Sequence, residues 1–263
     1  MSISYDLAGV PTIITGAGRG IGRAVALRFA ASNAQLVLND CDEAAVQESA
    51  QQCITLGAIA AVVVGDVTAP HTPTDIVSCC VNQFGAPRIV VNNAGIVKPA
   101  PLAELDDPTW NRIVDVNLTA AFRLIRACAE PMIAAAKAST GSAPCNGKIV
   151  NITSVDGLFG AVNQTHYSAA KAGIIGLTMA LAREWARYRI TVNAVAPGAI
   201  ATKMSESITT DEKLAANVLS MIPLGRWGTP DDIAGTVLHL AGADSDYITG
   251  QTISVCGGLR IAP

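Results

Sequence analysis

A glycine-rich turn near the N-terminus most constrains the fold of this chain. Residues 10–15 form an apolar run that predicts a β-strand, and a helical pattern begins after the run Thr15-Gly-Ala-Gly-Arg-Gly-Ile-Gly22. At such a junction, backbone N–H groups and the positive end of the helix can surround a diphosphate. The alternative is a turn that needs glycine only for its backbone conformation. We predict a dinucleotide site whose first contacts are Gly16, Arg19, Gly20, Ile21 and Gly22.

Strand-like and helix-like segments alternate along the rest of the chain. This alternation is typical of a parallel sheet with helices on both faces. The length of 263 residues, half of them apolar, suffices for one large core. We therefore predict an α/β fold, in which residues 1–263 form a single Rossmann-type, doubly wound domain with a mostly parallel seven-stranded sheet.

Charge and composition exclude several classes of partner. The chain has 18 basic and 21 acidic residues, a net charge of −3 and no basic cluster, so we expect no nucleic-acid partner. The N-terminus has no pattern of a signal peptide, and no apolar run is long enough to span a membrane, so we expect a cytoplasmic protein without a membrane partner. Seven cysteines without C-x-x-C spacing predict neither a disulfide nor a metal site.

An acidic residue follows the second predicted strand, residues 35–39. Asp40 lies eighteen residues beyond Gly22, where a carboxylate can accept hydrogen bonds from the adenosine ribose and would repel a 2′-phosphate. Arg19 acts in the opposite sense, because a basic side chain in the turn can pair with that phosphate. We expect the carboxylate to dominate, which favours NAD over NADP. Alternatively, Asp40 is a helix N-cap, since Asp42-Glu43 opens the next predicted helix.

Asparagines stand out in two apolar settings. The strand over residues 88–92 leads into Asn92-Asn93-Ala94-Gly95, where amides can join neighbouring strands and small residues allow a flat ring to approach. Asn117 interrupts the apolar face of a predicted helix over about residues 108–137, which is unfavourable unless its hydrogen bonds are satisfied. A purely structural amide explains Asn117 equally well. The following loop, residues 138–147, is rich in turn formers, and we expect it to be exposed and mobile.

Three polar side chains form the candidate catalytic group. The predicted strand over residues 148–154 ends at Ser154, on the edge where doubly wound sheets bind ligands. Tyr167 and Lys171 are four residues apart on a helix predicted to run to about residue 187, so they share one face. The lysine charge is expected to lower the pKa of the phenol from its ordinary ~10. We interpret His166 as peripheral, because adjacent helical residues point about 100° apart.

These motifs, in this order, resemble the short-chain dehydrogenase/reductase family over nearly the whole chain, in particular its 3-oxoacyl reductase and secondary alcohol dehydrogenase branch. The resemblance implies that Tyr167 transfers the hydroxyl proton and that Ser154 steadies the substrate oxygen. It implies that Lys171 holds the nicotinamide ribose, and that Asn117 completes a water-linked proton path. The implied cofactor is NAD, and hydride passes between it and a secondary alcohol or ketone.

The resemblance also implies cofactor contacts further along the chain, at Asp66, Val67, Asn93, Ala94, Gly95, Pro197, Gly198 and Thr202. In this family Asp66 would close the adenine pocket, although an aspartate just beyond a strand can equally cap a turn. Cys256 stands where relatives commonly have aspartate. The resemblance further implies a homotetramer whose subunits pack through the helix over residues 167–187.

The substrate is not specified by any motif. Residues 199–225 are polar and uneven, which predicts a substrate lid with a short helix over about residues 211–219. We expect Asp156, with Ser154 and Tyr167, to border the substrate, although an ordinary turn aspartate before Gly157 is an equal alternative. The function indicated is an NAD(H)-dependent oxidoreductase for secondary alcohols or ketones, including hydroxyacyl and 3-oxoacyl compounds. The alternatives are an isomerase or lyase with a transiently reduced cofactor, and a non-catalytic NAD-sensing protein.

Overall fold

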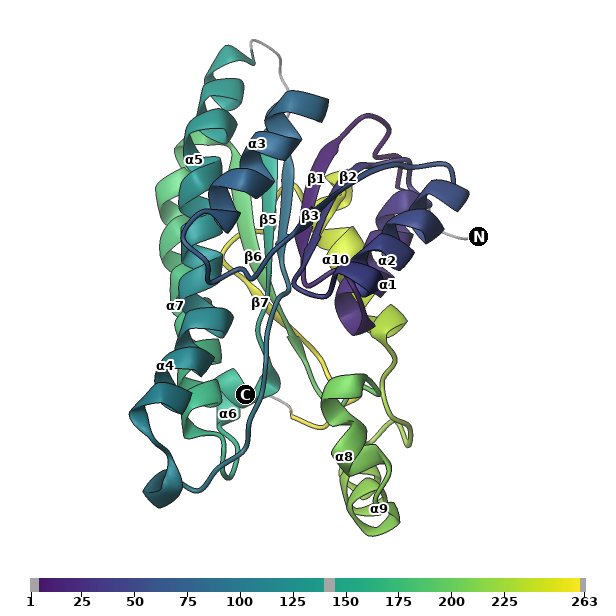
Figure 1. Ribbon diagram of the computed structural model, residues 1–263, viewed down its shortest axis with the longest axis vertical. Helices are drawn as coiled ribbons and strands as arrows, with labels where there is room; N and C mark the ends of the chain where they lie inside the picture. The colour runs from purple at the N-terminus through teal and green to yellow at the C-terminus, as the bar shows by residue number, and fades with distance from the viewer. Residues whose placement is uncertain (1–4, 140–144, 261–263) are drawn as a thin grey trace.

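The computed structural model describes residues 5–139 and 145–260, and its centre is a seven-stranded sheet (Figure 1). Every pair of neighbouring strands is parallel, in the order β3-β2-β1-β4-β5-β6-β7. The predicted doubly wound fold is thereby confirmed. The strands are β1 (Pro11–Thr15), β2 (Gln35–Asp40), β3 (Ile59–Val64), β4 (Ile89–Asn92), β5 (Gly147–Ile152), β6 (Ile190–Pro197) and β7 (Thr252–Val255).

Helices connect the strands and cover both faces of the sheet (Figure 1). The α-helices are α1 (Gly20–Ala30), α2 (Glu43–Thr55), α3 (Thr72–Phe84), α4 (Asp107–Val114), α5 (Ala120–Ala138), α6 (Val155–Phe159), α7 (Thr165–Trp185), α8 (Glu206–Thr209), α9 (Glu212–Ser220) and α10 (Pro230–Ala241). Short 3₁₀ turns lie at Leu102–Glu104, Ala186–Tyr188, Lys203–Ser205 and Ala243–Ser245. Among the described residues, no helix has the length and apolar character needed to cross a membrane.

Two cores form because successive strand residues point to opposite faces. Ile14 of β1 packs in a core with α1, α2 and α10, whereas its neighbour Ile13 packs in a core with α3, α5 and α7. Val91 and Val90 of β4 divide between the two cores in the same way. Burial on both faces explains why the strands are almost continuously apolar, and it fixes the register of the sheet.

The order of the sheet reverses between β1 and β4, and this position determines where a ligand can bind. From β1 the chain continues outward to β2 and β3, and from β4 it continues the other way to β5, β6 and β7. The turn after β1 and the segment after β4 therefore leave a crevice at the carboxyl ends of the strands. They are joined there, since the side-chain amide of Asn93 donates to the carbonyls of Thr15 at 2.9 Å and Gly16 at 3.0 Å.

The predicted helix over about residues 108–137 is not continuous α-helix. A π-helical turn, Asp115–Thr119, separates α4 from α5, and Asn117 lies within it. The Asn117 side chain donates to the carbonyl of Ile113 at 3.0 Å and to that of Ile96 at 2.9 Å. An amide that competes for a backbone carbonyl four residues earlier disturbs the regular α-helical ladder, and π turns of this kind are frequent at functional sites.

Other predicted boundaries also differ from the structure. Strand β5 ends at Ile152 rather than 154, and the unpredicted helix α6 follows, with Ser154 as its N-cap. A helix of five residues has too few turns to give a periodic pattern. Pro73 lies in the first turn of α3, where proline is favoured. Of the predicted loop over residues 138–147, residues 140–144 lie outside the described part of the chain.

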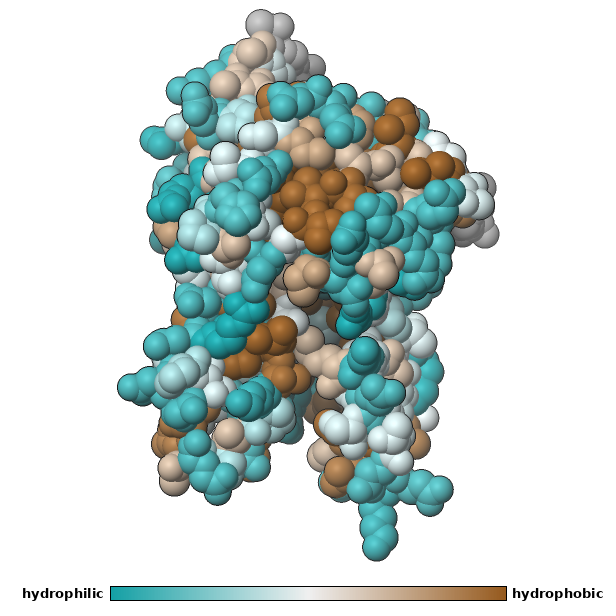
Figure 2. Space-filling view, viewed as in Figure 1, coloured by the Kyte–Doolittle hydropathy of each residue, from teal (hydrophilic) through white to brown (hydrophobic). Residues whose placement is uncertain are grey.

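The predicted lid segment forms a projection at the ligand edge. It contains α8 and α9, and Asp211 caps α9 by accepting from the backbone of Lys213 and Leu214 at 3.0 Å. The prediction of a short helix near residues 211–219 is confirmed, whereas α8 was missed. Figures 1 and 2 show this projection on one side of a hollow, with α4 and α6 on the other.

Candidate active site

The glycine turn after β1 is a tightly packed backbone cradle. Gly16 has a positive φ of 63°, and a Cβ there would lie 2.8 Å from the Cα of Ala94. A Cβ at Gly22 would lie 2.0 Å from the carbonyl oxygen of Gly16. Side chains at these two positions would clash with the chain itself, so close approach requires both glycines, and Gly16 is also required by its conformation. Ile21 continues into the first turn of α1 and packs at the edge of the core.

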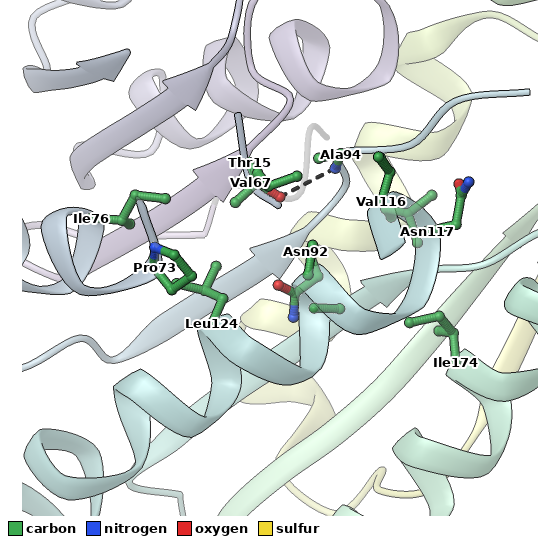
Figure 3. A pocket seen from close by; sticks show the side chains of 13 residues that line it. Thr15, Val67, Pro73, Ile76, Asn92, Ala94, Val116, Asn117, Leu124 and Ile174 are labelled. Carbon is green, nitrogen blue, oxygen red and sulfur yellow. Dashed lines mark hydrogen bonds between the residues drawn. The ribbon is translucent and has the colours of Figure 1, made fainter. Parts of the chain in front are cut away.

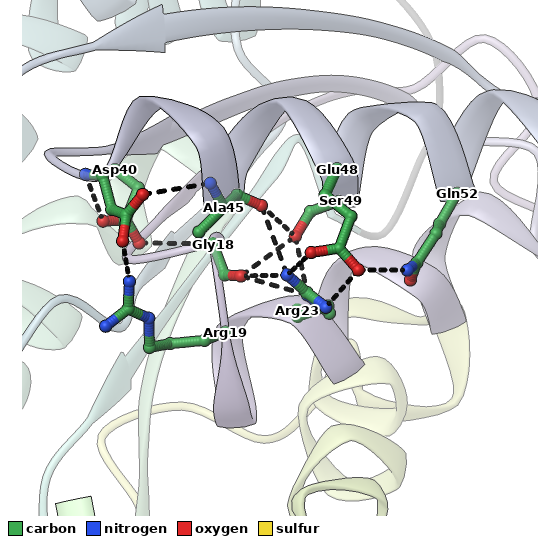
Figure 4. Close-up of polar contacts among 9 residues, drawn as sticks. Gly18, Arg19, Arg23, Asp40, Ala45, Glu48, Ser49 and Gln52 are labelled. Atoms are coloured by element: carbon green, nitrogen blue, oxygen red, sulfur yellow. Dashed lines mark hydrogen bonds and ion pairs between the residues drawn. The ribbon is translucent and has the colours of Figure 1, made fainter. Parts of the chain in front are cut away.

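Asp40 lies against this turn, as the sequence predicted (Figure 4). Its Oδ2 accepts from the backbone of Gly18 at 2.9 Å, and its Oδ1 accepts from the backbone of Asp42 at 3.0 Å. The alternative that Asp40 caps the next helix is wrong, because the N-cap of α2 is Asp42, whose carboxylate accepts from Ala45 at 3.1 Å. The same Asp42 forms an ion pair with Arg19.

The carbonyl of Gly18 is held by two side chains that the sequence analysis missed. Arg23 donates to it through Nε at 3.0 Å and through Nη2 at 2.7 Å, and Ser49 donates at 3.3 Å (Figure 4). Glu48 pairs with Arg23 at 2.9 Å. With the N–H of Gly18 bound to Asp40, side chains hold the two peptide units that flank Gly18. The four-residue spacing of Arg19 and Arg23 was visible, but not which one faces the turn.

Asp66, at the end of β3, is fully engaged by side chains of this chain. One carboxylate oxygen accepts from the backbone of Thr68 at 2.9 Å and from its hydroxyl at 2.8 Å, and the other accepts from Arg112 at 2.7 Å. Burial raises the pKa of Asp66, but the hydrogen bonds from Thr68 and Arg112 outweigh it and hold that pKa below its ordinary value. The turn-cap alternative therefore holds, and Arg112 is a partner that was not foreseen.

A small pocket lies between the ends of β1 and β4 and the helices α3, α5 and α7 (Figure 3). Val67, Thr15, Ala94 and Asn117 line it, and the backbone of Ala94 donates to the hydroxyl of Thr15 at 3.2 Å. Its volume of about 10 Å³ matches a single water molecule. Val67 and Asn117, two predicted site residues, therefore share one small pocket at this edge of the sheet.

Lys171, Asn117 and Gly95 converge at the ligand edge of the sheet. A Cβ at Gly95 would lie 2.8 Å from Oδ1 of Asn117 and 3.4 Å from Nζ of Lys171, which places both side chains beside this glycine. Lys171 is 3% exposed and donates to the carbonyl of Ile152 at 2.9 Å. Burial lowers its pKa from 10.5 to about 8. Within the described residues, no hydrogen-bond donor reaches the buried Oδ1 of Asn117.

Tyr167 is buried next to this lysine, with its ring centroid 5.6 Å from Nζ of Lys171. Burial raises the pKa of the phenol, the charge of Asp156 raises it further, and a hydrogen bond with Ser154 acts in the opposite direction. The predicted lowering of this pKa is therefore wrong for the ligand-free protein. Removing the phenolate from water is the largest contribution to this shift.

Ser154 and Asp156 form the first turn of α6 beside Tyr167. Ser154 Oγ accepts from the backbone N–H of Asp156 at 3.0 Å. Burial raises the pKa of Asp156, while the hydrogen bond with Ser154 and the charge of Arg260 lower it. The structure thus brings Ser154, Asp156 and Tyr167 together, as predicted, and adds Arg260 from the chain after β7.

The remaining predicted contacts lie on the other side of the crevice. Pro197 ends β6, and Gly198 donates to the carbonyl of Val255 at 3.0 Å. A Cβ at Gly198 would lie 2.6 Å from Cβ of Cys256, so this glycine allows the two segments to touch. Thr202 lies against the glycine turn, with its Cγ2 3.5 Å from a Cβ built at Gly20.

His166 is buried, and its Nε2 is 3.0 Å from the carbonyl oxygen of Lys98. It therefore anchors the segment after β4 to α7, a structural contact that the peripheral interpretation did not foresee. The seven cysteines are free thiols. Within residues 5–139 and 145–260, no cluster of three or more His, Cys, Asp or Glu side chains could hold a metal ion.

This arrangement fits a dinucleotide. The glycine turn is closely packed at Gly16 and Gly22, the backbone of Gly18 is held by side chains, and a carboxylate stands at the edge of the turn. The buried Lys171 has hydrogen-bonding capacity beyond its contact to Ile152. The crevice also lies at the reversal of strand order, where open α/β sheets bind nucleotides.

Comparison with known proteins identifies the family. Residues 16–260 match the sequence family described as enoyl-(acyl carrier protein) reductase. The 3-oxoacyl-[acyl-carrier-protein] reductase FabG of Thermotoga maritima is 38% identical over 97% of this chain and 99% of its own length. Human (3R)-3-hydroxyacyl-CoA dehydrogenase is 37% identical over 94% of each chain.

A solved structure from Agrobacterium tumefaciens, with bound NADP, superimposes with a TM-score of 0.88. It is 34% identical and covers 98% of this chain and 99% of its own. These matches span the part of the chain that contains the glycine turn, Ser154, Tyr167 and Lys171. The chain belongs to the short-chain dehydrogenase/reductase family.

Proposed function

We propose that the protein is an oxidoreductase that moves hydride between NAD(H) and a secondary alcohol or ketone. The observation that carries this proposal is the buried pair of Tyr167 and Lys171, beside Ser154 and at the same sheet edge as the glycine turn. A structural role does not explain why a buried lysine lacks a carboxylate partner. When bound, the nicotinamide supplies the hydride donor or acceptor.

The residues of this chain supply proton transfer and orientation. In ketone reduction, Tyr167 donates its proton to the substrate oxygen, because burial holds its pKa above the ordinary value and keeps the phenol protonated. Ser154 orients the same oxygen. Lys171 holds the nicotinamide ribose, and its positive charge favours the phenolate once Tyr167 has given up its proton. Asn117, with its buried Oδ1, positions the water that reloads the proton.

We propose NAD rather than NADP as the preferred cofactor. Gly16, Arg19, Gly20, Ile21, Gly22 and the segment Asn93-Ala94-Gly95 would surround the diphosphate and nicotinamide, with Pro197, Gly198 and Thr202 opposite. Asp40 at the turn would accept from the ribose hydroxyls and repel a 2′-phosphate. Asp66 and Val67 would flank the adenine. The NADP-containing relative is the reason to test this preference directly.

The substrate class follows from the two walls of the hollow in Figure 2. Apolar side chains are exposed in the segments on both sides, at Leu158 and Phe159 of α6 and at Met204 and Leu214 within residues 199–225. An acyl chain fits such walls, and the names of two relatives refer to 3-oxoacyl and 3-hydroxyacyl substrates. We infer a 3-oxoacyl or 3-hydroxyacyl compound, with residues 199–225 as the lid over a single catalytic domain.

We further propose a cytoplasmic homotetramer. Helix α7 exposes small residues at Ala172, Gly176 and Ala180, beside the larger Met179, and α5 exposes Phe122. Small residues on an exposed apolar helix face allow a second helix to pack closely. Light scattering at micromolar concentration is expected to give four times the mass of the chain, and a monomeric mass would contradict this assembly.

The experiment for the function is Tyr167→Phe, assayed by the appearance of reduced cofactor with secondary alcohols and 3-hydroxyacyl thioesters. We expect the wild type to turn over at least one of these substrates. In the variant, turnover should fall by ~10² or more while NADH binding is retained. Near-normal turnover would remove Tyr167 as the acid–base. An isomerase or lyase would convert substrate without accumulating reduced cofactor, and an NAD-sensing protein would bind cofactor without turnover.

A further inference from the structure

Arg19, the one basic residue of the glycine turn, is paired with a neighbouring carboxylate. It forms an ion pair with Asp42, the N-cap of α2. Arg23, one turn further along α1, is bound to the carbonyl of Gly18 and to Glu48. Of these two arginines, only Arg19 projects toward the region beyond β2 where Asp40 and Asp42 lie.

Asp42 is fixed in the position that holds this arginine. Its Oδ1 accepts from the backbone of Ala45 at 3.1 Å, and its own backbone N–H donates to Oδ1 of Asp40 at 3.0 Å. The hydrogen bond from Ala45, and then the charges of Arg19 and Lys203, hold the pKa of Asp42 below its ordinary value. The carboxylate is therefore ionised at neutral pH, and its second oxygen faces Arg19.

We propose that Asp42 is a specificity-determining residue for the cofactor, because it engages Arg19 and thereby prevents this side chain from binding a 2′-phosphate on the adenosine ribose. This inference rests on the proposed function, in which a dinucleotide binds at the glycine turn with its ribose at Asp40. Asp40 and Asp42 then act by different means. Asp40 repels the phosphate at its own position, whereas Asp42 engages the arginine of the glycine turn.

The structure makes a distinction that the sequence could not make. Asp40 contacts the backbone of Gly18 and Asp42, and it does not pair with Arg19. Removing Asp40 alone would take away repulsion and leave Arg19 bound to Asp42. Releasing the arginine requires a change at Asp42 itself. Both partners of the pair are about half exposed, with side-chain exposures of 45% and 43%, so the pair is weak and its release has a moderate effect.

Asp42→Asn is the sharpest substitution, since asparagine caps helices as well as aspartate does but carries no charge. We expect kcat/KM with NADP to rise about fivefold to twentyfold, while kcat/KM with NAD changes less than about threefold. Binding of 2′,5′-ADP, measured by calorimetry against 5′-AMP, is expected to tighten by the same factor. This second readout does not depend on turnover.

Two further variants make the assignment specific. Arg19→Met in the wild type is expected to change the binding of 2′,5′-ADP and of 5′-AMP by the same factor. Arg19→Met combined with Asp42→Asn is expected to abolish the gain for 2′,5′-ADP. Asp231→Asn is the matched control, because Asp231 pairs with Arg28 at the opposite end of the same helix α1. It removes one surface charge and one arginine partner, and should change neither cofactor preference nor 2′,5′-ADP binding.

The outcomes separate this inference from the proposed cofactor preference. A wild-type enzyme that uses NADP as well as NAD would contradict the preference itself. A wild type that prefers NAD, with no gain in Asp42→Asn or a gain that persists without Arg19, would overturn the role of Asp42. If Arg19→Met weakened 2′,5′-ADP binding as strongly in the wild type as in Asp42→Asn, the arginine would already be available, which would also overturn it.

Discussion

Two buried lysines, Lys148 of β5 and Lys171 of α7, lie at opposite ends of strand β5 and have very different surroundings. Lys148, near the start of the strand, is 6% exposed and donates to the carbonyl of Gly242 at 3.0 Å and to Ser245 at 3.1 Å. It also forms an ion pair with Asp246 at 2.6 Å. Lys171 is 3% exposed and donates to the carbonyl of Ile152 at the other end of β5. Among the described residues, no carboxylate forms an ion pair with it.

The difference separates the structural edge of the sheet from its ligand edge. At the amino end of β5, every hydrogen-bonding site of the ammonium is satisfied, and Lys148 ties the strand to the end of α10. At the carboxyl end, a buried charge without an ion-pair partner is unfavourable, and the pKa of Lys171 falls to about 8. Such incompletely compensated groups are typical of functional sites, where stability is given up for chemistry.

The largest effect is expected from Lys171→Met on catalysis. If the lysine charge acts on the cofactor and on Tyr167, kcat/KM should fall by about 10²–10³, the range for removing one preorganised charged donor. Steady-state kinetics with NAD would measure this. Lys137→Met, at an exposed lysine of α5, is the control and should be silent. A loss of less than about tenfold would mean that the two lysines do not differ in function.

Lys148→Met should act on stability instead. Removing the ammonium leaves the carboxylate of Asp246 without its partner, and we expect the free energy of unfolding to fall by about 2–4 kcal/mol. Urea denaturation would measure this, with kcat per folded molecule unchanged. Adding Asp246→Asn should restore much of the loss, because no unpaired charge then remains. A change below about 1 kcal/mol would show that the ion pair is not what distinguishes Lys148.

Lys171→Met should also change stability, with the opposite sign. Below pH 8, Lys171 is charged in both the folded and the unfolded chain, so folding carries the full cost of burying the ammonium. Its removal should therefore raise the free energy of unfolding at pH 7 by about 1–3 kcal/mol. As the pH rises from 8 toward 10.5, the wild type loses this cost and the two proteins converge. A pH-independent difference between them would contradict the comparison.

Much of the sheet and the turn was predictable because the signals are long and redundant. The apolar strands repeat seven times, and the order of the motifs follows the order of the strands. The proximity of Tyr167 and Lys171 follows from helical spacing alone. Their chemical roles, by contrast, stay predictions, because proximity does not specify which group binds a substrate or cofactor.

Features that depend on burial or on side-chain direction were not predictable. The direction of the pKa shift of Tyr167 is set by desolvation, which spacing does not report. The π turn at Asn117 depends on the competition of one amide for the carbonyl of Ile113. The pair of Arg19 with Asp42 joins residues 23 positions apart, and nothing in a local pattern favours Asp42 over Asp40 as its partner.

The smallest effect is expected from Arg112, which has a carboxylate partner as Lys148 does but is exposed to solvent. Arg112 and Asp66 have side-chain exposures of 50% and 39%, and exposed pairs contribute little. Arg112→Met should therefore change the free energy of unfolding by less than about 1 kcal/mol. Arg112 also donates to the hydroxyl of Thr68 at 2.7 Å, so it fixes the loop that carries Asp66.

If that loop borders the adenine, Arg112→Met should raise KM for NAD about threefold to tenfold without changing kcat, which corresponds to about 1 kcal/mol of binding. Arg112→Lys keeps the charge but cannot bridge Asp66 and Thr68 with one planar group, so it should restore KM only in part. Urea denaturation and steady-state kinetics on the same preparations would test both effects. If Arg112→Met lost as much stability as Lys148→Met, burial would not matter to the comparison. The presence of a carboxylate partner alone would then determine how much a cation stabilises this fold.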